Sequence, residues 1–242
     1  MDTVGLLYTV KQNEQYRNSE HVKFLGHCLS LCDKSQSQNF QDVWALYESG
    51  FKRDGFYVEF GATDGIDGSN TYLLAKEYDW KGILAEPNPV WHSRLHANRD
   101  DDQTDISHEC VYTKTGDKLD FLAVDDACLS TIRGFGNDDE HTLKRKQNSL
   151  ISVDTVSLMY LLDFYSAPNA IDYISVDTEG SEYDILEAFF RDNDCYDVRA
   201  FTVEHNFNDE FRNKIHDLMT KNNYVRKFSE FSRWDDFYVK VS

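Results

Sequence analysis

The sequence is poor in proline, in positive charge and in long apolar runs. It has 3 Pro, and 25 Lys and Arg against 43 Asp and Glu, which gives its 242 residues a formal net charge of −18. Such a surface repels nucleic acid and anionic membranes at long range, so we expect neither as a partner. The one compact basic cluster, residues 144–146, is typical of a solvated face. The early apolar run 5–10 is too short to span a bilayer, which predicts no membrane insertion.

Cysteine is also scarce, and its five positions are irregularly spaced: 28, 32, 110, 128 and 195. An odd number of thiols with no secretory signal before them predicts reduced cysteines and a cytoplasmic protein. No segment is rich enough in proline, glycine or serine to be a linker. We therefore expect an N-terminal helical extension over residues 1–38 and one domain over residues 39–242.

Hydrophobic patterning within that domain alternates between strand and helix. The predicted strands are 56–60, 82–86, 107–112, 119–124, 171–177 and 199–204. The predicted helices are 39–50, 70–78, 89–98, 156–164, 182–190 and 211–219. Alternation of this kind predicts an α/β fold, with a parallel sheet covered by helices on both faces. Residues 224–228 and 236–241 predict a closing hairpin.

Two strand ends carry the pattern of a nucleoside-binding pocket. The run 55–65 predicts a buried strand that ends at Glu59 and opens into a loop holding Gly61 and Gly65. The next predicted strand ends at Glu86. Glycine allows tight turns and close approach to a ligand, and an acid at the tip of the second strand is placed to bind ribose hydroxyls. The pattern predicts a site for an adenosine-containing cofactor.

Charge separates two classes of such cofactor. A dinucleotide requires its pyrophosphate at a helix N-terminus, but this loop also carries Asp64 and Asp67, whose carboxylates would repel it. S-adenosylmethionine has no phosphate, and its sulfonium is cationic. The loop therefore favours the methyl donor over NAD.

In these residues the chain resembles the FkbM-type methyltransferases, a family of class I S-adenosylmethionine-dependent enzymes. The resemblance covers about residues 37–240 and is most specific at Glu-Pro-Asn-Pro, residues 86–89, and Asp-Thr-Glu-Gly-Ser-Glu, residues 177–182. It implies a Rossmann-like fold with a mostly parallel seven-stranded sheet and a reversed terminal strand. That implication agrees with the predicted hairpin.

The resemblance also implies roles for individual residues around the cofactor. On the methionine side it places Glu59, Gly61, Ala62 and Gly65. Glu86 would bind the ribose hydroxyls, with Pro87 and Asn88 under the adenosine and Cys110 and Val111 near the adenine. The donor's carboxylate would be held by Ser69, Asn70 and Thr71, although Ser69 could equally be a helix N-cap.

Acidic residues at two further strand ends are the candidate catalytic groups. Asp177 ends a buried strand, and Glu179 and Glu182 follow it, although acids in a first helical turn are also favoured without any catalytic role. His205 ends the next strand and could be a base, a metal ligand or a wall residue. We expect Asp177, Glu179 and His205 to orient or deprotonate the acceptor, and the same three are candidate ligands for Mg²⁺. Asp177 is also a candidate cofactor-binding residue. His92 and His141 are weaker candidates.

The sequence thus predicts an S-adenosylmethionine-dependent O-methyltransferase. The resemblance implies a hydroxyl of a sugar, a glycan or a similar small acceptor. Two alternatives stay open, namely an NAD-dependent oxidoreductase and a non-catalytic module that binds an adenosine cofactor. Neither the acceptor nor the oligomeric state follows from the sequence.

Overall fold

The computed structural model describes residue 8 and residues 11–124, 130–134, 148–229 and 231–241. His141 and the basic cluster 144–146 lie outside the described residues.

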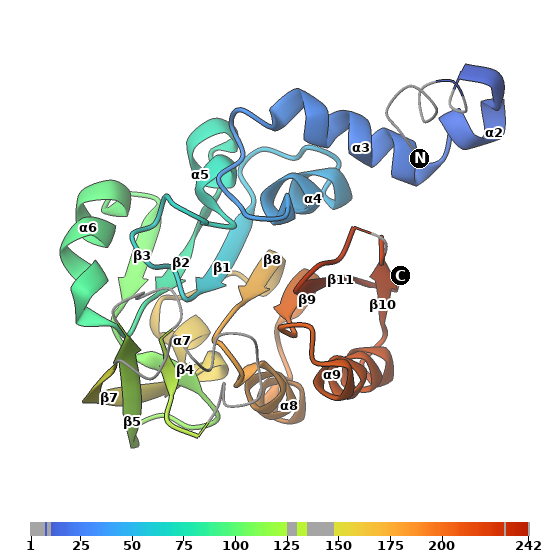
Figure 1. The fold of residues 1–242 in the computed structure, drawn as a ribbon. Helices are drawn as coiled ribbons and strands as arrows, with labels where there is room; N and C mark the ends of the chain where they lie inside the picture. Colours follow the sequence, from blue (N-terminus) through green and yellow to red (C-terminus); the bar gives the residue numbers. More distant parts are fainter. Residues whose placement is uncertain (1–7, 9–10, 125–129, 135–147, 230, 242) are drawn as a thin grey trace.

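A seven-stranded sheet forms the centre of the molecule (Figure 1). Its strands, in spatial order, are β10 (Tyr224–Lys227), β11 (Asp235–Lys240), β9 (Asp197–Glu204), β8 (Ala170–Val176), β1 (Phe56–Phe60), β2 (Lys81–Ala85) and β3 (Thr104–Ser107). Neighbours from β9 to β3 pair in parallel, whereas β11 is antiparallel to both β9 and β10. This arrangement confirms the predicted parallel sheet with an antiparallel terminal hairpin.

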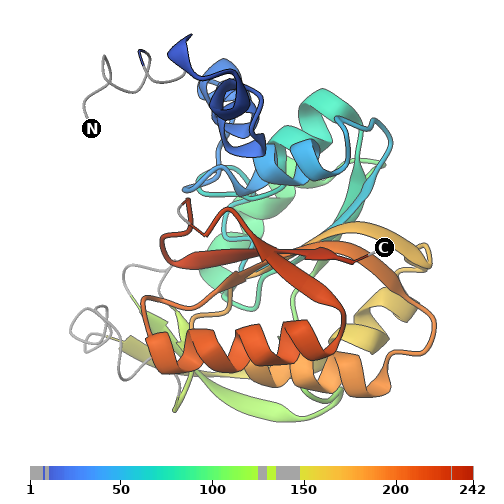
Figure 2. The same cartoon turned by 90° about the vertical axis from the view of Figure 1, so that its right-hand side faces the viewer.

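Helices cover both faces of this sheet (Figure 2). One core cluster joins the sheet to α7 (Leu158–Phe164), α8 (Glu182–Asp192) and α9 (Asp209–Lys221). The other joins it to α3 (Glu20–Leu31), α4 (Gln41–Glu48), α5 (Tyr72–Tyr78) and α6 (Pro89–Arg99). The central strands are apolar along most of their length because they are buried on both sides, as parallel strands generally are.

A second sheet of four strands lies beside the first, and the sequence did not predict it. Its order is β4 (Cys110–Tyr112), β7 (Asn148–Ser157), β5 (Lys118–Val124) and β6 (Thr131–Ile132). The predicted strand 107–112 is therefore two strands, β3 and β4, in different sheets. The predicted helix 156–164 begins only at Leu158, because residues 156–157 complete β7.

The pattern of β7 explains why it escaped prediction. Val153 is buried in a small cluster with Phe121 and Ile132, whereas Leu150 is exposed. Serines and Asp154 occupy much of the remaining strand, so its apolar residues are too few to mark an element by periodicity alone.

The N-terminal extension packs against the domain through α3. Phe24 and Cys28 of this helix are buried, and the Phe24 ring stacks on Phe228 with their centroids 4.8 Å apart. A shorter helix, α2 (Glu14–Arg17), precedes it. Ser37 forms an isolated parallel bridge with Gly68, so the end of the extension reaches the loop that follows β1.

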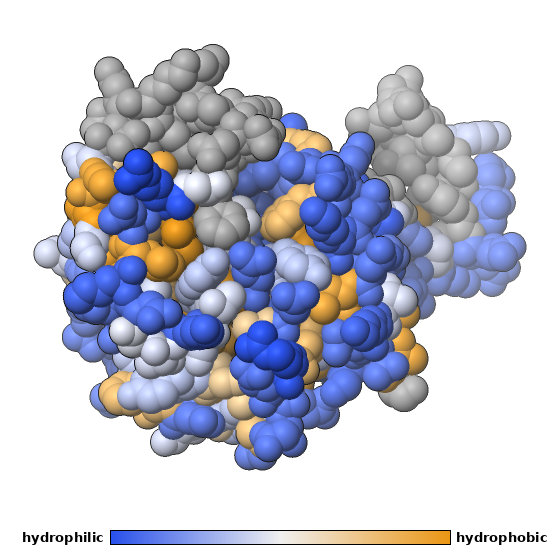
Figure 3. All heavy atoms as spheres, turned by 90° about the horizontal axis from the view of Figure 1, so that it is seen from below, coloured by the Kyte–Doolittle hydropathy of each residue, from blue (hydrophilic) through white to orange (hydrophobic). Residues whose placement is uncertain are grey.

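Hydrophilic side chains cover most of the face seen from below in Figure 3, in keeping with the acidic composition. Hydrophobic side chains gather in a smaller patch on the same face. Among the described residues, no helix has the length and apolar character that a membrane span needs.

Candidate active site

A cavity of about 280 Å³ opens at the carboxyl ends of β1, β2, β8 and β9. Parallel strands place their following loops at one edge of the sheet, where ligands of α/β proteins bind. The predicted site residues that line the cavity are Gly61, Ser69, Glu86, Pro87, Cys110, Val111, Asp177 and Glu179. The predicted residues outside the lining are Glu59, Ala62, Gly65, Asn70, Thr71, Asn88 and His205.

Glu86 follows β2 and is only 4 % exposed. Its Oε1 accepts a hydrogen bond from the Asn88 N–H at 2.7 Å, and its Oε2 accepts one from the Thr63 N–H at 2.9 Å. Burial raises the pKa of Glu86 to about 7, although these two donors oppose the shift. Each carboxylate oxygen has further lone-pair capacity, so Glu86 can still accept hydrogen bonds from a ligand.

Glu59 is buried outside the cavity lining and accepts hydrogen bonds from the residues that lead into α5. Its Oε1 accepts from the Asn70 N–H at 2.6 Å, and its Oε2 accepts from the hydroxyls of Ser69 at 3.0 Å and Thr71 at 2.5 Å. Burial raises the pKa of Glu59, and the nearby charge of Arg99 opposes that effect. The carboxylate therefore fixes the loop 69–71 and the beginning of the helix.

Gly61 and Gly65 occupy positions where the backbone conformation and the close packing exclude a side chain. Gly61 has a φ of +69°, and a Cβ there would lie 2.4 Å from the carbonyl oxygen of Asp177. Gly65 has a φ of +79°, and its Cβ would lie 2.5 Å from Cγ of Arg99. Only glycine satisfies both the left-handed conformation and the close approach. Gly61 thus brings the end of β1 against the end of β8, whereas Gly65 packs against a buried arginine.

The predicted adenosine side is lined by short segments after β2 and at β4. Pro87, Cys110 and Val111 line the cavity, and burial together with the charge of Glu86 raises the pKa of the Cys110 thiol to about 12. Asn88 lies beside them as the N-cap of α6, where its side chain accepts from the Val90 N–H and donates to Ser130 Oγ at 3.1 Å.

Three carboxylates meet on the other side of the cavity. Asp177 follows β8, Glu179 follows in the same loop, and Glu204 ends β9. One oxygen from each of the three lies within 4.8 Å of the other two. Burial and the neighbouring acids raise the pKa values of Asp177 and Glu204. Close acids of this kind suit a role in proton transfer or in binding a cation.

Glu182, the last acid of the Asp-Thr-Glu-Gly-Ser-Glu run, supports the loop from within. Its Oε1 accepts from the N–H and the hydroxyl of Thr178 and from the Gly180 N–H, at 2.8 to 3.0 Å. This contact holds Glu179 in a left-handed conformation, with a φ of +61°, while the Asn206 amide donates to Glu179 Oε2 at 3.1 Å.

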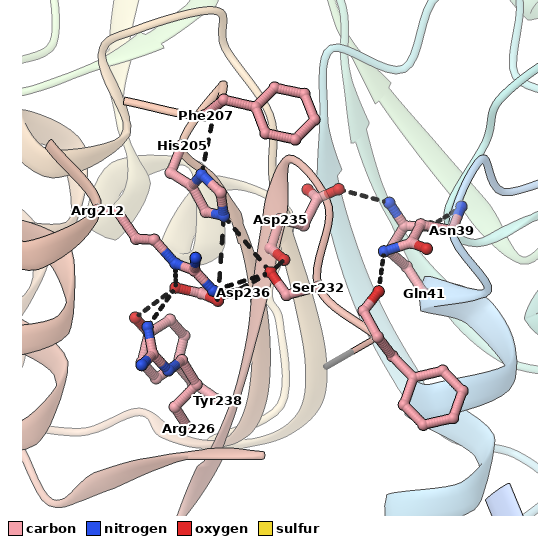
Figure 4. Close-up of polar contacts among 11 residues, drawn as sticks. Asn39, Gln41, His205, Phe207, Arg212, Arg226, Ser232, Asp235, Asp236 and Tyr238 are labelled. Atoms are coloured by element: carbon pink, nitrogen blue, oxygen red, sulfur yellow. Dashed lines mark hydrogen bonds and ion pairs between the residues drawn. The ribbon is translucent and has the colours of Figure 1, made fainter. Parts of the chain in front are cut away.

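His205 is not among the residues that line the cavity, and its ring lies beside Phe207, Ser232 and Asp236 (Figure 4). It is 2 % exposed, its Nδ1 accepts from the Phe207 N–H at 3.2 Å, and its Nε2 lies 3.4 Å from Ser232 Oγ. Burial lowers the pKa of His205 to about 4, so the ring is neutral at pH 7. Glu204, not His205, therefore joins Asp177 and Glu179 at the cavity. His92, the weaker candidate, lies on α6 with Nε2 2.9 Å from the Glu86 carbonyl oxygen.

The structure adds lining residues that sequence reasoning missed. Asn206 and Phe207, both with positive φ, and Trp234 stand next to the acids, and Gln38 reaches the cavity from the extension. Phe121 and Ile132 come from the second sheet. A polar Asn followed by an aromatic residue after a strand was the one available signal for 206–207. Nothing in the local sequence marks the others, since long-range packing places them.

Several solved structures resemble this chain at low sequence identity. A precorrin-6y C5,15-methyltransferase from Geobacter metallireducens is 10 % identical with a TM-score of 0.43, over 82 % of this chain and 85 % of that one. Fibrillarin, a pre-rRNA processing protein of Methanococcus jannaschii, is 10 % identical with a TM-score of 0.41, over 78 % and 67 %. The N-terminal domain of human METTL16 is 9 % identical with a TM-score of 0.42, over 81 % and 66 %.

None of the curated protein sequences compared with this chain is significantly similar to it. The model of the methyltransferase FkbM domain, by contrast, matches residues 59–237. That range begins at Glu59, within β1, and extends into β11, so it contains the loops that follow β1, β2, β8 and β9 at the cavity. This protein belongs to the FkbM family of methyltransferases.

Proposed function

We propose that the protein transfers the methyl group of S-adenosylmethionine to a hydroxyl of a sugar, a glycan or a similar small acceptor. The observation that carries this proposal is the order of three acids and a glycine along the sheet edge. Glu204 ends β9, and Asp177, Gly61 and Glu86 follow the neighbouring strands β8, β1 and β2. Three strand spacings of ~4.8 Å separate Glu86 from Glu204 by roughly 14 Å, which leaves room for an adenosine at one end and an acceptor at the other.

The start of α5 argues against a dinucleotide. In dinucleotide-binding folds the pyrophosphate takes the free N–H groups of the helix after the first strand. Here the carboxylate of Glu59 already accepts from Asn70 N and from the Ser69 and Thr71 hydroxyls. The described lining of the cavity also includes five acids and no lysine or arginine. Such a lining suits a sulfonium and a neutral or cationic acceptor, and it disfavours a phosphate or a nucleic acid.

An aromatic wall supports an acceptor that contains a ring. Phe207 and Trp234 line the cavity with ring centroids 6.1 Å apart, and Phe207 is 52 % exposed. Flat apolar rings beside carboxylates can pack on the C–H face of a sugar while the acids accept from its hydroxyls. This combination supports a sugar or another polyhydroxylated ring as the acceptor.

Methyl transfer is an in-line displacement. The acceptor oxygen forms a bond to the methyl carbon, the carbon–sulfur bond breaks with its electron pair going to sulfur, and the hydroxyl proton must leave. Alignment of oxygen, carbon and sulfur supplies much of the rate. In this proposal Asp177 and its neighbours orient the hydroxyl, and a carboxylate with a raised pKa is suited to receive the proton near neutral pH.

Calorimetry with S-adenosylmethionine, its demethylated product and NAD tests the cofactor. We expect the first two to bind and Glu86→Ala to weaken binding by about 1.5–3 kcal/mol, the worth of charged hydrogen bonds. Glu187→Ala, which removes an exposed carboxylate of α8, is the matched control. Binding of NAD alone would refute the proposal.

Transfer of a labelled methyl group to a panel of sugars and glycans tests the acceptor. Asp177→Asn should retain the fold and cofactor binding but lose turnover. Cofactor binding without transfer to any acceptor would instead favour a non-catalytic module.

A further inference from the structure

Among the described residues, Glu204, like Asp42 and Glu182, has a buried carboxylate oxygen without a hydrogen-bond donor, but only Glu204 of these three lines the cavity. The carboxylate is 5 % exposed, and no donor within the described part of the chain forms a hydrogen bond to its Oε2. Glu59, by comparison, receives three donors, and Asp236 is paired with Arg212 and Arg226. A buried acceptor left without a donor costs about 1–3 kcal/mol, and more if it is charged. Oε2 of Glu204 is therefore a buried acceptor at the cavity that has no donor among the described residues.

The carboxylate of Glu204 faces two others across the cavity. Its ligand oxygen lies within 4.8 Å of those of Asp177 and Glu179, and all three residues line the same space. Hard divalent cations prefer carboxylate oxygens, and Mg²⁺ binds them at ~2.1 Å, so two of its ligands lie at most ~4.2 Å apart. The upper limit of 4.8 Å on the separations of the three oxygens is close to that range.

The three residues are also held by different parts of the backbone. β8 and β9 are adjacent parallel strands, paired over residues 170–176 and 197–203, so Asp177 and Glu204 extend from neighbouring strand ends. The loop that presents Glu179 is fixed by Glu182 through Thr178 and Gly180. The site is preformed on rigid elements, which favours a specific ion over a diffuse cloud of counterions.

We propose that Asp177, Glu179 and Glu204 bind one divalent cation of the Mg²⁺ or Mn²⁺ class, and that the acceptor hydroxyl completes its coordination. This inference rests on the proposed function and deepens it. The carboxylates then act as ligands, and the cation orients the hydroxyl and lowers its pKa, so the proton leaves to water. Mg²⁺ retains several waters in protein sites, and three carboxylates leave positions for them and for the acceptor.

Titration of Mn²⁺ into EDTA-treated full-length protein tests the site, with the loss of the free Mn²⁺ signal followed by electron paramagnetic resonance. We expect one Mn²⁺ per chain, and a loss of affinity of at least tenfold in Glu204→Gln. Glu210→Gln, the same change at an exposed position of α9, should bind Mn²⁺ as the wild type does. Circular dichroism checks folding, and Asp177→Asn replaces the first variant if that variant does not fold.

Calorimetry with S-adenosylmethionine separates this inference from the proposed function. Glu204→Gln should bind the methyl donor with unchanged affinity, and EDTA should abolish methyl transfer by the wild type without abolishing donor binding. Wild-type protein that binds no Mn²⁺ at millimolar concentration, or equal Mn²⁺ affinity in Glu204→Gln, would overturn the metal site. Mn²⁺ binding without donor binding would support the site while refuting the proposed function.

Discussion

The ring of His205 holds the backbone of Phe207, because Nδ1 accepts the Phe207 N–H at 3.2 Å (Figure 4). Asn206 and Phe207 have φ values of 48° and 58°, a left-handed conformation that costs non-glycine residues roughly 1–2 kcal/mol each. The backbone N–H of His205 also donates to the Trp234 carbonyl oxygen at 2.6 Å. A histidine that sequence patterning placed in the chemistry thus positions the aromatic wall of the cavity.

Replacement of His205 by alanine should lower the free energy of unfolding by about 1–3 kcal/mol, because the Phe207 N–H loses its acceptor and a buried space is left. Urea denaturation measures the change. His205→Asn is the informative partner, since its amide oxygen can take the place of Nδ1. We expect it to recover more than half of the loss. Equal destabilisation by both variants would show that the hydrogen bond to Phe207 is unimportant.

Arg99 should be among the most sensitive positions for stability. Its side chain is fully buried and donates to the Gly65 carbonyl oxygen and to Tyr57 Oη, both at 2.8 Å, and its charge lies near Glu59. Removal of one member of a buried charged network typically costs about 3–5 kcal/mol. We expect Arg99→Ala to destabilise the protein by this amount in urea denaturation. Arg94→Ala, an exposed arginine of the same helix, should change stability by less than ~0.5 kcal/mol.

Gly61 tests the contact between β1 and β8. A Cβ at this position would lie 2.4 Å from the backbone oxygen of Asp177, which cannot move without displacing the strand end. Gly50 has nearly the same φ, +68°, with open space around it, so Gly50→Ala isolates the conformational cost. We expect Gly61→Ala to be less stable than Gly50→Ala by about 1–3 kcal/mol and to lose S-adenosylmethionine affinity. Thermal unfolding and calorimetry give the two quantities, and similar values for both variants would contradict the close packing.

Glu86 should make cofactor binding depend on pH. Burial raises the pKa of Glu86 from 4.5 to about 7, so the ionised carboxylate disfavours the folded state. The protonated carboxyl contributes to the stability of the fold, and this contribution is fully present below pH 4.5 and is lost as the pH rises through 7. Ribose hydroxyls donate best to the ionised form. Affinity for S-adenosylmethionine should therefore fall up to about tenfold between pH 8 and pH 6, as Glu86 takes up a proton.

Calorimetry across that range measures the effect, and Glu86→Gln is the control. The variant cannot ionise at position 86, so any pH dependence it retains belongs to other groups of the protein or the ligand. Wild type and variant with the same pH profile would remove Glu86 as its cause.

Local sequence was enough to predict the strands β1, β2, β8 and β9 and the residues at their ends. Buried parallel strands need continuous apolar runs, and parallel order brings their ends to one edge, so Glu86, Asp177 and Gly61 could be placed at a shared site in advance. The antiparallel hairpin and the helices on both faces followed from the same periodicities.

Only the tertiary structure determined which of the acids line the cavity and which donors satisfy their buried carboxylates. Glu59 and Glu86 both follow a buried apolar run. Glu59, however, accepts hydrogen bonds from the residues that precede α5, such as the Asn70 N–H, whereas Glu86 lines the cavity. Glu204 and His205 are adjacent in sequence, yet Glu204 lines the cavity and His205 supports a loop. Neighbours along a strand point to opposite faces, and hydrogen-bond partners come from distant segments such as Trp234, so these assignments depend on long-range packing that no local pattern encodes.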